Sequence, residues 1–397
     1  MKQGWEIKNI GDVCKVIAGQ SPEGKFYNKD RNGLPFYQGK KEYGEKYIGE
    51  PTTWTTKVTK EAEANDILMS VRAPVGPINF ATQRICIGRG LAAIRATKLI
   101  DKEFLFNFLL KHENEIIGNT GAVFNSINKA QIESIKIPVP PLAEQQRIVA
   151  ILDEAFAAIA KAKANAEQNL KNAKELFESY LQGVFENPKD NWEKKKWGDL
   201  CDFVRGPFGG SLKKNIFKDD GYVVYEQKHA IHDHFNQLRY FIDEDKFREM
   251  IRFELKPGDI IMSCSGVTLG RVAIVPKGIK RGIINQALLK LTPKKNISVH
   301  FLQHWLRSSI FQKIIFDYSG GAAIPNVPSA KILKDILIPV PSLKEQERVV
   351  SEIELISAQT QKLEAVYQAI INNLEELKKS ILQKAFSGEL TKVEVVA

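Results

Sequence analysis

The loop at residues 19–26 comes closest to a pattern that does chemistry, the glycine-rich loop that cradles nucleotide phosphates. Gly19, Gly24 and Lys25 have the required spacing, and a strand-like run precedes them. However, Phe26 stands where a serine or threonine would hold magnesium, and no convincing helix follows. We therefore expect a flexible, polar surface loop here and no nucleotide site.

Two sets of histidines are spaced like metal ligands. His229, His232 and His234 lie close together in the sequence, and His300 and His304 are four residues apart on a predicted helix. Neither set comes with cysteine or acidic ligands at a matching spacing, so we expect no metal site. The four cysteines are dispersed without a C-x-x-C pair, which is typical of buried thiols in a reducing compartment.

Patterns for methyl transfer and for DNA cleavage are also incomplete. The only Pro-Pro pair, Pro140-Pro141, lacks the preceding amide and the following aromatic residue that adenine methylation needs. A nuclease set could be drawn on Asp190, Glu193 and Lys195, but this stretch is more simply a charged linker. Because no set of catalytic residues is evident, the sequence predicts a binding protein that holds no cofactor of its own. An enzyme with an unfamiliar active site is the alternative.

The net charge of +10 is concentrated in two segments of the 397-residue chain. Basic residues outnumber acidic ones by 20 to 15 in residues 1–140 and by 25 to 17 in residues 186–341. The segments 141–185 and 342–390 carry net charges of −1 and −2, and the tail 391–397 is neutral. Two basic segments on a near-neutral frame suit a polyanion such as nucleic acid.

Loops of the two basic segments supply the candidate DNA contacts. Lys and Arg side chains bind phosphates, and Gln, Arg and Lys also pair with base edges. The candidates in the first segment are Gln20, Ser21, Lys25, Tyr27, Gln38, Lys40, Lys41, Tyr43, Arg72 and Arg89. Those in the second segment are Arg205, Ser211, Lys213, Lys214, Gln227, Lys228, His229, Ser265 and Arg271. For any one of them, an ordinary solvated side chain is the alternative.

The chain contains the same half twice. Residues 138–147 return as residues 339–348, and the match continues without a gap to Phe185 and Phe386. The starts of the halves also match, since Trp5 and Cys14 recur as Trp192 and Cys201. A duplicated chain folds into two similar domains, and internal two-fold symmetry is the arrangement that reads two DNA half-sites.

Each half consists of an α+β segment followed by a long helix. Glycine and proline punctuate residues 1–140, where short β-like runs and a helical stretch at 102–117 occur. Residues 141–185 and 342–390 are instead rich in helix formers, and helices of this length need a partner. We predict that they pair with each other as an antiparallel coiled coil. Two separate helices, each packed on its own domain, are the alternative.

A heptad pattern with steps of three and four residues indicates the seam of this coiled coil. Alanines in the first helix face larger residues in the second helix, which would let the two helices approach closely. The large side chains assigned to the seam are Leu152, Ile159, Leu176, Ile353, Ile356, Leu363, Ile370, Leu374 and Leu377.

The chain resembles the specificity subunits of type I restriction–modification systems. The resemblance rests on the doubled Pro-Leu-x-Glu-Gln motif at 137–149 and 338–350 and on the Gly-Asp-Ile-Ile-Met-Ser run at 258–263. It implies target-recognition domains at 1–140 and 186–341, a central helix at 141–185, a distal helix at 342–390 and a tail at 391–397. The fold class is then α+β, with two pseudo-symmetric recognition domains separated by the paired helices.

The family resemblance also implies the function and the partners. Each recognition domain would read one half of a bipartite, asymmetric target in double-stranded DNA. The helices would set the spacer and dock two modification (methyltransferase) subunits. Those subunits would bind S-adenosylmethionine, and restriction subunits, where present, would bring ATP and magnesium.

The sequence also bears on the location of the protein and on one alternative function. No apolar run approaches the ~18 residues of a membrane span, so we expect a cytoplasmic protein of a prokaryote without a membrane partner. A coiled-coil scaffold with protein-binding globular ends is the competing function.

Overall fold

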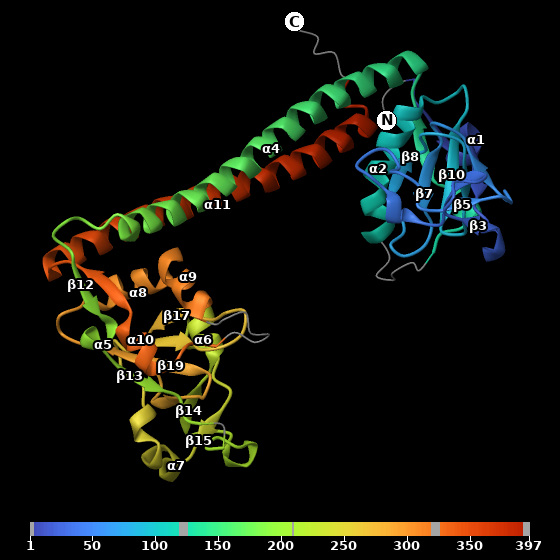
Figure 1. The fold of residues 1–397 in the computed structure, drawn as a ribbon. Helices are drawn as coiled ribbons and strands as arrows, with labels where there is room; N and C mark the ends of the chain where they lie inside the picture. The colour runs from blue at the N-terminus through green and yellow to red at the C-terminus, as the bar shows by residue number, and fades with distance from the viewer. Residues whose placement is uncertain (1–3, 119–125, 209, 319–325, 392–397) are drawn as a thin grey trace, which may run out of the picture. The chain divides into compact units, whose positions relative to one another are not determined.

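The computed structural model describes residues 4–118, 126–208, 210–318 and 326–391 (Figure 1). All of the predicted tail except Thr391 lies outside these ranges. The chain divides into two compact units, Met1–Glu167 with Ala369–Ala397, and Gln168–Gln368. The boundary between the units therefore falls inside both long helices, whereas the predicted division placed domain boundaries at the helix ends.

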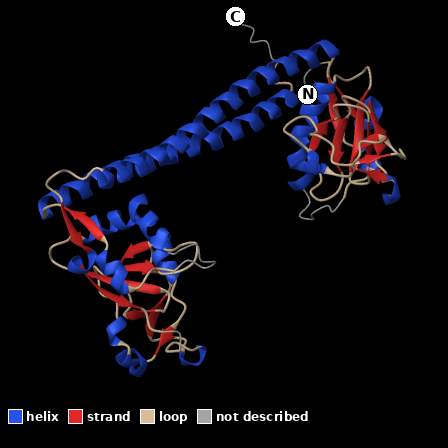
Figure 2. Cartoon of the chain, viewed as in Figure 1, coloured by secondary structure: helices blue, strands red, loops and turns tan. Residues whose placement is uncertain are grey.

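The first unit is built from short strands and a few helices (Figure 2). The strands are β1 (Glu6–Asn9), β2 (Cys14–Ala18), β3 (Tyr27–Asn28), β4 (Leu34–Tyr37), β5 (Trp54–Thr55), β6 (Glu61–Ala62), β7 (Ile67–Ser70), β8 (Ile78–Phe80), β9 (Ile85–Ile87), β10 (Leu91–Ala96) and β11 (Lys136–Val139). The helices are α1 (Ile10–Val13), α2 (Lys102–Gly118), α3 (Lys129–Glu133) and the first part of α4 (Leu142–Glu186), with 3-10 turns at Gly24–Phe26 and Lys40–Glu42.

The central sheet of the first unit has the order β2-β10-β7-β8 and is antiparallel. It is buried on both faces because its residues alternate between two cores. Ile67 and Met69 belong to a cluster with α2 and α4, while Leu68 packs with Tyr37 and Ile87 of the second sheet. That second sheet, β3-β5-β4-β9-β6, is mixed, since β4 and β9 run parallel. Alternate residues of each central strand thus pack into two different layers.

The second unit repeats this plan with its own elements. The strands are β12 (Glu193–Lys196), β13 (Cys201–Arg205), β14 (Tyr222–Tyr225), β15 (Phe241–Ile242), β16 (Ile260–Ser263), β17 (Val272–Ile274), β18 (Gly282–Ile284), β19 (Leu288–Pro293) and β20 (Leu337–Val340). The helices are α5 (Trp197–Leu200), α6 (Gln227–His232), α7 (Glu244–Glu249), α8 (Val299–Arg307), α9 (Ser309–Tyr318), α10 (Ala330–Asp335) and the first part of α11 (Leu343–Ser387), with 3-10 turns at Lys214–Ile216 and Ile251–Phe253.

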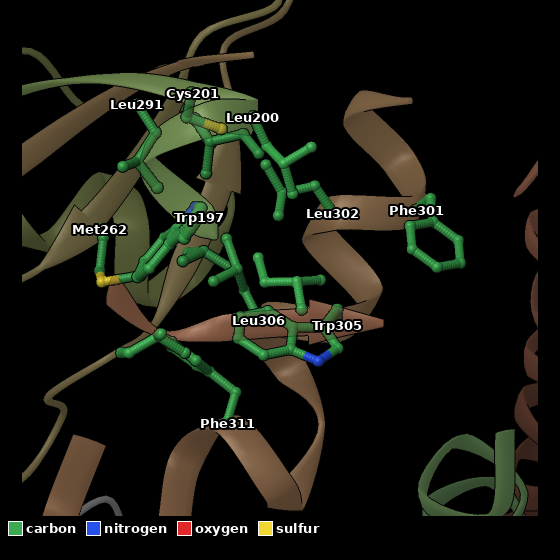
Figure 3. Packing of buried hydrophobic residues seen from close by; sticks show 14 of the residues in the cluster. Trp197, Leu200, Cys201, Met262, Leu291, Phe301, Leu302, Trp305, Leu306 and Phe311 are labelled. Carbon is green, nitrogen blue, oxygen red and sulfur yellow. The ribbon is translucent and has the colours of Figure 1, made fainter. Parts of the chain in front are cut away.

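The central sheet of the second unit, β13-β19-β16-β17, has the same strand order as that of the first. Its main core lies between this sheet and the helices α8 and α9 (Figure 3). Trp197 packs edge-on against Trp305 and Phe311, with ring centroids 6.1 and 5.3 Å away. Edge-to-face packing of large rings stabilises such a core beyond its buried area.

The doubled Pro-Leu-x-Glu-Gln motif has the same structural role in both units. Gln145 is fully buried, its Oε1 accepts a hydrogen bond from the Asp101 amide at 2.7 Å, and its Nε2 donates to the Pro140 carbonyl at 2.8 Å. Gln346 makes the corresponding bonds to Ser298 and Pro341 at 2.7 and 2.9 Å. Each glutamine therefore fixes the start of a long helix to the segment that precedes α2 or α8.

The long helices pair antiparallel within each unit, which confirms the predicted fold class. In the first unit, Leu152 of α4 shares a core with Leu382 and Phe386 near the end of α11. In the second unit, Phe185 near the end of α4 shares a core with Val349 and Ile353 near the start of α11. The helices begin at Leu142 and Leu343 and end at Glu186 and Ser387, close to the predicted limits.

The predicted seam is wrong in part. Leu152, Ile159 and Ile353 are buried, and Ile356 and Leu374 are half-buried, but Leu176, Leu363, Ile370 and Leu377 are exposed. Leu181, Ile371 and Leu382 are buried instead. The reason is the helical period, because a straight helix drifts by about 20° per heptad from an ideal 3.5-residue repeat.

Among the described residues, no helix is long and apolar enough to cross a membrane.

Candidate nucleic-acid interface

Four loops of the first unit meet at one edge of its sheets. Gly19 and Gln20, after β2, donate backbone hydrogen bonds to Leu91 and Ile87 at 2.9 and 3.0 Å. Gly88 and Gly90, between β9 and β10, donate to the carbonyls of Tyr37 and Gln38 at 2.8 and 3.1 Å. The Val71 amide, after β7, donates to Gly90 at 2.9 Å. These bonds hold the loops in one continuous surface.

Glycine is required where these loops cross. A Cβ atom on Gly19 would lie 2.2 Å from the Gly88 carbonyl oxygen, and one on Gly90 would lie 2.3 Å from that of Gln38. Such distances are far inside van der Waals contact, so any side chain would push the loops apart. The glycines of the phosphate-loop-like segment thus serve close backbone approach rather than a nucleotide.

The side chains on this edge line two hollows. One, of about 390 Å³, is lined by Tyr27, Phe36, Gln38, Gly39, Lys40, Lys41, Glu42, Thr52 and Thr53. The other, of about 210 Å³, is lined by Gln38, Gly39, Lys40, Ser70, Arg72, Ala73, Arg89 and Gly90. Gln38 and Lys40 belong to both hollows, so the structure brings together six of the ten residues predicted for this segment. A guanidinium or an amide here can pair bidentate with a base edge.

The remaining predicted residues of the first unit have other surroundings. Lys25 is exposed and forms an ion pair with Glu23 at 2.7 Å. The Ser21 hydroxyl accepts a bond from the Arg89 amide at 3.2 Å, and Gln20 is exposed beside it. The Tyr43 hydroxyl donates into the sheet, to the Leu68 carbonyl at 2.9 Å, and burial raises its pKa. Tyr43 is therefore a structural residue of this edge.

The Tyr27 hydroxyl is also engaged within its own loop. It donates to the Pro22 carbonyl at 2.8 Å, and desolvation raises its pKa. Its ring stacks on Phe36 with the centroids 4.7 Å apart. The stacked rings of Tyr27 and Phe36 line the larger hollow. The Tyr27 hydroxyl proton is used in the hydrogen bond to Pro22.

The second unit forms the corresponding edge from different residues. Gly206 donates to Leu288 at 2.9 Å, as Gly19 donates to Leu91. Arg205 donates through Nη2 to the Asn326 side chain at 2.9 Å, and Asn326 forms a β-bridge with Ser265. Lys213, Lys214 and Arg271 are exposed, and Ser211 is half-buried in the turn after Phe208.

Two residues predicted to contact DNA in this unit form hydrogen bonds within it, and Gln227 is half-buried whereas His229 is buried. The Gln227 amide nitrogen donates to the Ser263 hydroxyl and to the Ser265 carbonyl, the latter at 2.6 Å. His229 is fully buried, and its Nδ1 accepts a bond from the Glu226 amide at 2.9 Å. Burial lowers the His229 pKa, which favours the neutral ring. The expectation of a direct DNA contact by His229 is wrong, because the side chain does not reach the surface.

Strand register shows which loop residues of the two units are equivalent. Tyr37 pairs with Ile87, and Tyr225 pairs with Ile284, at the same place in the two sheets. The residue after each tyrosine is equivalent, so Gln38 corresponds to Glu226 and not to Gln227. The Glu226 carboxylate lies 3.3 Å from the Lys228 ammonium. The loop of the first unit thus offers an amide where the second offers a carboxylate.

Sequence reasoning missed two prominent residues of the second edge. Phe208 and Val267 are 89% and 93% exposed, on the loops that follow β13 and β16. Phe208 follows the Gly206-Pro207 pair. A large apolar residue inside a Gly- and Pro-rich loop was the available signal.

The histidines that were spaced like metal ligands have different surroundings in the structure. His304 is largely buried, and burial lowers its pKa to about 4. His232 and His234 stack on each other with the ring centroids 5.8 Å apart. In residues 4–118, 126–208, 210–318 and 326–391, no three His, Cys, Asp or Glu side chains gather so that they could hold a metal ion.

Known proteins resemble the chain along most of its length. Residues 2–171 and 189–376 both match the family described as the type I restriction modification DNA specificity domain. The specificity subunit of the type I restriction enzyme EcoBI from Escherichia coli is 26% identical over 416 residues, covering 98% of this chain and 86% of that protein. A putative type I restriction enzyme MjaX specificity subunit from Methanocaldococcus jannaschii is 42% identical over 186 residues, but this match spans only 46% of this chain and 43% of that protein.

Solved structures show the same fold. A structure from a study of assembly of the type I R-M system superposes with a TM-score of 0.79 at 20% identity, covering 98% of this chain and 99% of that one. The HsdS subunit from Thermoanaerobacter tengcongensis gives a TM-score of 0.65 at 20% identity over 98% of both chains. With two matched domains that span most of its length, the chain belongs to the family of type I restriction–modification DNA specificity proteins.

Proposed function

We propose that each unit reads one half of a bipartite, asymmetric target in duplex DNA and that catalysis resides in other subunits. The observation that carries this proposal is the repeated loop edge, built on the same sheet order but furnished with different side chains. The first edge presents Gln38, Arg72 and Arg89, whereas the second presents Glu226 and Ser265 at equivalent positions. Different donors and acceptors on one scaffold imply two different half-sites.

The exposed apolar residues of the long helices support docking of two modification subunits. In the second unit, Leu176, Leu355, Leu363 and Val366 are exposed although they lie on helices that pair through another face. Exposed aliphatic residues in such a row are typical of protein contact surfaces. The modification subunits would bind S-adenosylmethionine and transfer the methyl group. Restriction subunits, where they join the complex, would bring the sites for ATP and magnesium.

The test of the proposed function is methylation-sensitive sequencing of DNA from cells that carry this chain with its methyltransferase. We expect a split motif methylated on adenine only when this chain is present. A matched strain in which the chain is deleted but the methyltransferase is expressed is the control. If a methyltransferase shown to bind this chain produces no new methylation, the function is that of a protein-binding scaffold.

The dependence of DNA binding on salt separates the same two functions in purified material. Duplex binding should weaken steeply with salt, because each phosphate contact releases counterions from the DNA. A protein-binding scaffold would show neither this dependence on salt nor a preference for the target sequence. The measurement is the dissociation constant of the purified complex for target and scrambled duplexes at several salt concentrations.

We also propose that the helices set the spacer of the target. Insertion of seven residues, two helical turns, into both helices preserves the pairing faces and adds about 10 Å to each helix at ~1.5 Å per residue. We expect a longer spacer and unchanged half-sites in the methylated motif. Altered half-sites would contradict a role of the helices in spacing alone.

A further inference from the structure

Two apolar side chains of the second unit are exposed to an unusual degree. Phe208 is 89% and Val267 is 93% exposed, whereas the next most exposed large apolar residue in the described ranges is Leu355 at 58%. An apolar side chain held in water gains free energy when a ligand covers it. Both residues lie on loops, where binding residues concentrate.

Backbone bonds anchor the two loops at neighbouring points. Gly206 donates to Leu288, the first residue of β19, and a Cβ atom on it would lie 1.9 Å from the Asn285 carbonyl oxygen. The turn at Phe208 is closed by a bond from the Ser211 amide to the Phe208 carbonyl at 2.9 Å. The Cys264 amide donates to Ala287, one residue before β19, at 2.9 Å.

The side chain of Asn326 joins the roots of the same loops. It accepts a bond from Arg205, two residues before Pro207, and its backbone bridges to Ser265. Phe208 and Val267 therefore extend from two roots that are fixed to one another and to the start of β19.

The equivalent edge of the first unit is cationic. Counting from the matched glycines Gly19 and Gly206 aligns Phe208 with Ser21. Counting from the matched bridges at Arg72 and Ser265 aligns Val267 with Pro74. The second unit thus has Ser265 in place of Arg72 and two apolar tips in place of Ser21 and Pro74, while its arginine at this edge, Arg205, bonds to Asn326.

Basic residues follow both tips closely in the sequence. Lys213 and Lys214 follow Phe208 within six residues, and Arg271 follows Val267 within four. All three are exposed. A ligand that fits this edge would carry negative charges for the basic residues and apolar groups for Phe208 and Val267. The major groove of DNA at an A·T pair fits this description, because the thymine presents its C5-methyl group there.

We propose that Phe208 and Val267 contact the C5-methyl groups of thymines in the half-site read by the second unit. This inference rests on the proposed function and names the base pairs recognised there, A·T pairs read through their methyl groups. The first unit, with Arg72 and Arg89 at the equivalent edge, reads its half-site through hydrogen bonds instead.

The experiment uses the chain in complex with its methyltransferase subunits and the target found by methylation sequencing. Absence of any methylated motif would defeat the proposed function itself, separately from this inference. In a duplex carrying the motif, each thymine of the second half-site is replaced in turn by deoxyuridine, which lacks only the methyl group. We expect binding to weaken about four-fold at one or two of these positions, the loss of one buried methyl group.

Variants connect that loss to the two residues. Phe208→Ser places the residue of the first unit, Ser21, at the equivalent position, and Val267→Ser removes the second apolar tip. Each variant should bind the thymine and deoxyuridine duplexes with nearly equal affinity at its own position. Ile251→Ser, which changes an exposed apolar residue elsewhere in the same unit, is the matched control and should keep the four-fold difference.

Three results would overturn the inference. The first is a difference between thymine and deoxyuridine that persists in both serine variants. The second is a second half-site without an A·T pair. The third is loss of methyltransferase binding in these variants with unchanged DNA affinity of the complexes that still form, because the tips would then be a protein-docking surface.

Discussion

The two units carry different surface side chains on the same scaffold. Their comparison distinguishes the residues that the fold requires from the residues that face a ligand. Both central sheets have a buried aspartate before the inner strand, Asp66 and Asp259, which accepts backbone bonds from Glu63 and Lys256 at 2.8 Å. Both also bury a helix-starting glutamine. At the loop edges, in contrast, the second unit has Ser265 in place of Arg72, and its exposed apolar tips Phe208 and Val267 stand in place of Ser21 and Pro74. Scaffold residues repeat, and surface residues diverge.

The largest expected effect comes from removing the two arginines of the first edge. Arg72→Ala with Arg89→Ala should weaken binding of the complex to its target by at least about 30-fold, since each bidentate base contact contributes roughly 1–3 kcal/mol. The loss of base preference should be confined to the first half-site, as read by binding to a panel of single-base variants. Arg84→Ala is the control, because Arg84 is exposed but pairs with Glu61 at 2.7 Å. Loss of preference in both half-sites would contradict independent reading by the units.

A repeated scaffold residue should matter for stability rather than recognition. Gln145→Leu leaves the Asp101 amide and the Pro140 carbonyl without their buried partner, so we expect a loss of about 2–4 kcal/mol in unfolding free energy. Gln346→Leu should cost a similar amount in the second unit. Urea denaturation followed by circular dichroism measures both, and Gln146→Leu, at an exposed neighbour, is the control. Equal stability of Gln145→Leu and Gln146→Leu would show that the motif has no structural role.

The buried aspartates sharpen the comparison because their partners differ. Asp66 forms an ion pair with Arg95 at 2.7 Å, whereas Asp259 accepts a bond from the Thr292 hydroxyl at 2.6 Å. Asp66→Asn breaks a charge-assisted contact and should cost about 1.5–3 kcal/mol, while Asp259→Asn should cost about 1 kcal/mol. Denaturant titrations of the two variants test this order. A larger loss for Asp259→Asn would mean that the partner's charge does not govern the difference.

A pH dependence of the second unit should be an effect of similar, modest size. Burial lowers the His304 pKa from 6.5 to about 4, so the folded state favours the neutral ring. A depressed pKa contributes stability above the unfolded value of 6.5, and this stability is lost as the pH falls toward 4. We expect a loss of roughly 1–2 kcal/mol between pH 7 and pH 5.

His304→Asn places there the residue that the first half has at the corresponding position, Asn107. The variant should lack this part of the pH dependence when unfolding free energies are compared at pH 7 and pH 5. An unchanged difference between the two pH values would assign the effect to other groups.

Several features of the fold could be predicted from the sequence because they arise from local or repeated patterns. The long helices follow from runs of helix formers, and their ends lie within two or three residues of the prediction. The central strands follow from apolar runs such as Ile67–Ser70. The exposed seam positions Leu363, Ile370 and Leu377 could not be predicted, because the drift of a straight helix accumulates over several heptads.

The candidate surface was predicted less completely. Gln38, Lys40, Arg72 and Arg89 come together in the structure as their residue types suggested, although they are spread over 52 positions from 38 to 89. His229 was misassigned because a polar residue in a basic loop has the same sequence signal whether it faces the ligand or is buried, while the half-buried Gln227 bonds to Ser263 and Ser265. Only the register of β14 against β18 distinguishes Glu226 from Gln227 as the equivalent of Gln38.

The sequence by itself determined the duplication, the two long helices, the basic character of both halves and the family. Each of these features follows from residue types or from the repeat along the chain. The tertiary structure alone decided which loops share an edge, which polar residues are buried, and that the second edge carries apolar tips. The physical reason is that loop convergence depends on backbone bonds between residues far apart in sequence, such as Gly90 with Gln38 and Gly206 with Leu288. No local pattern of residues encodes those pairings.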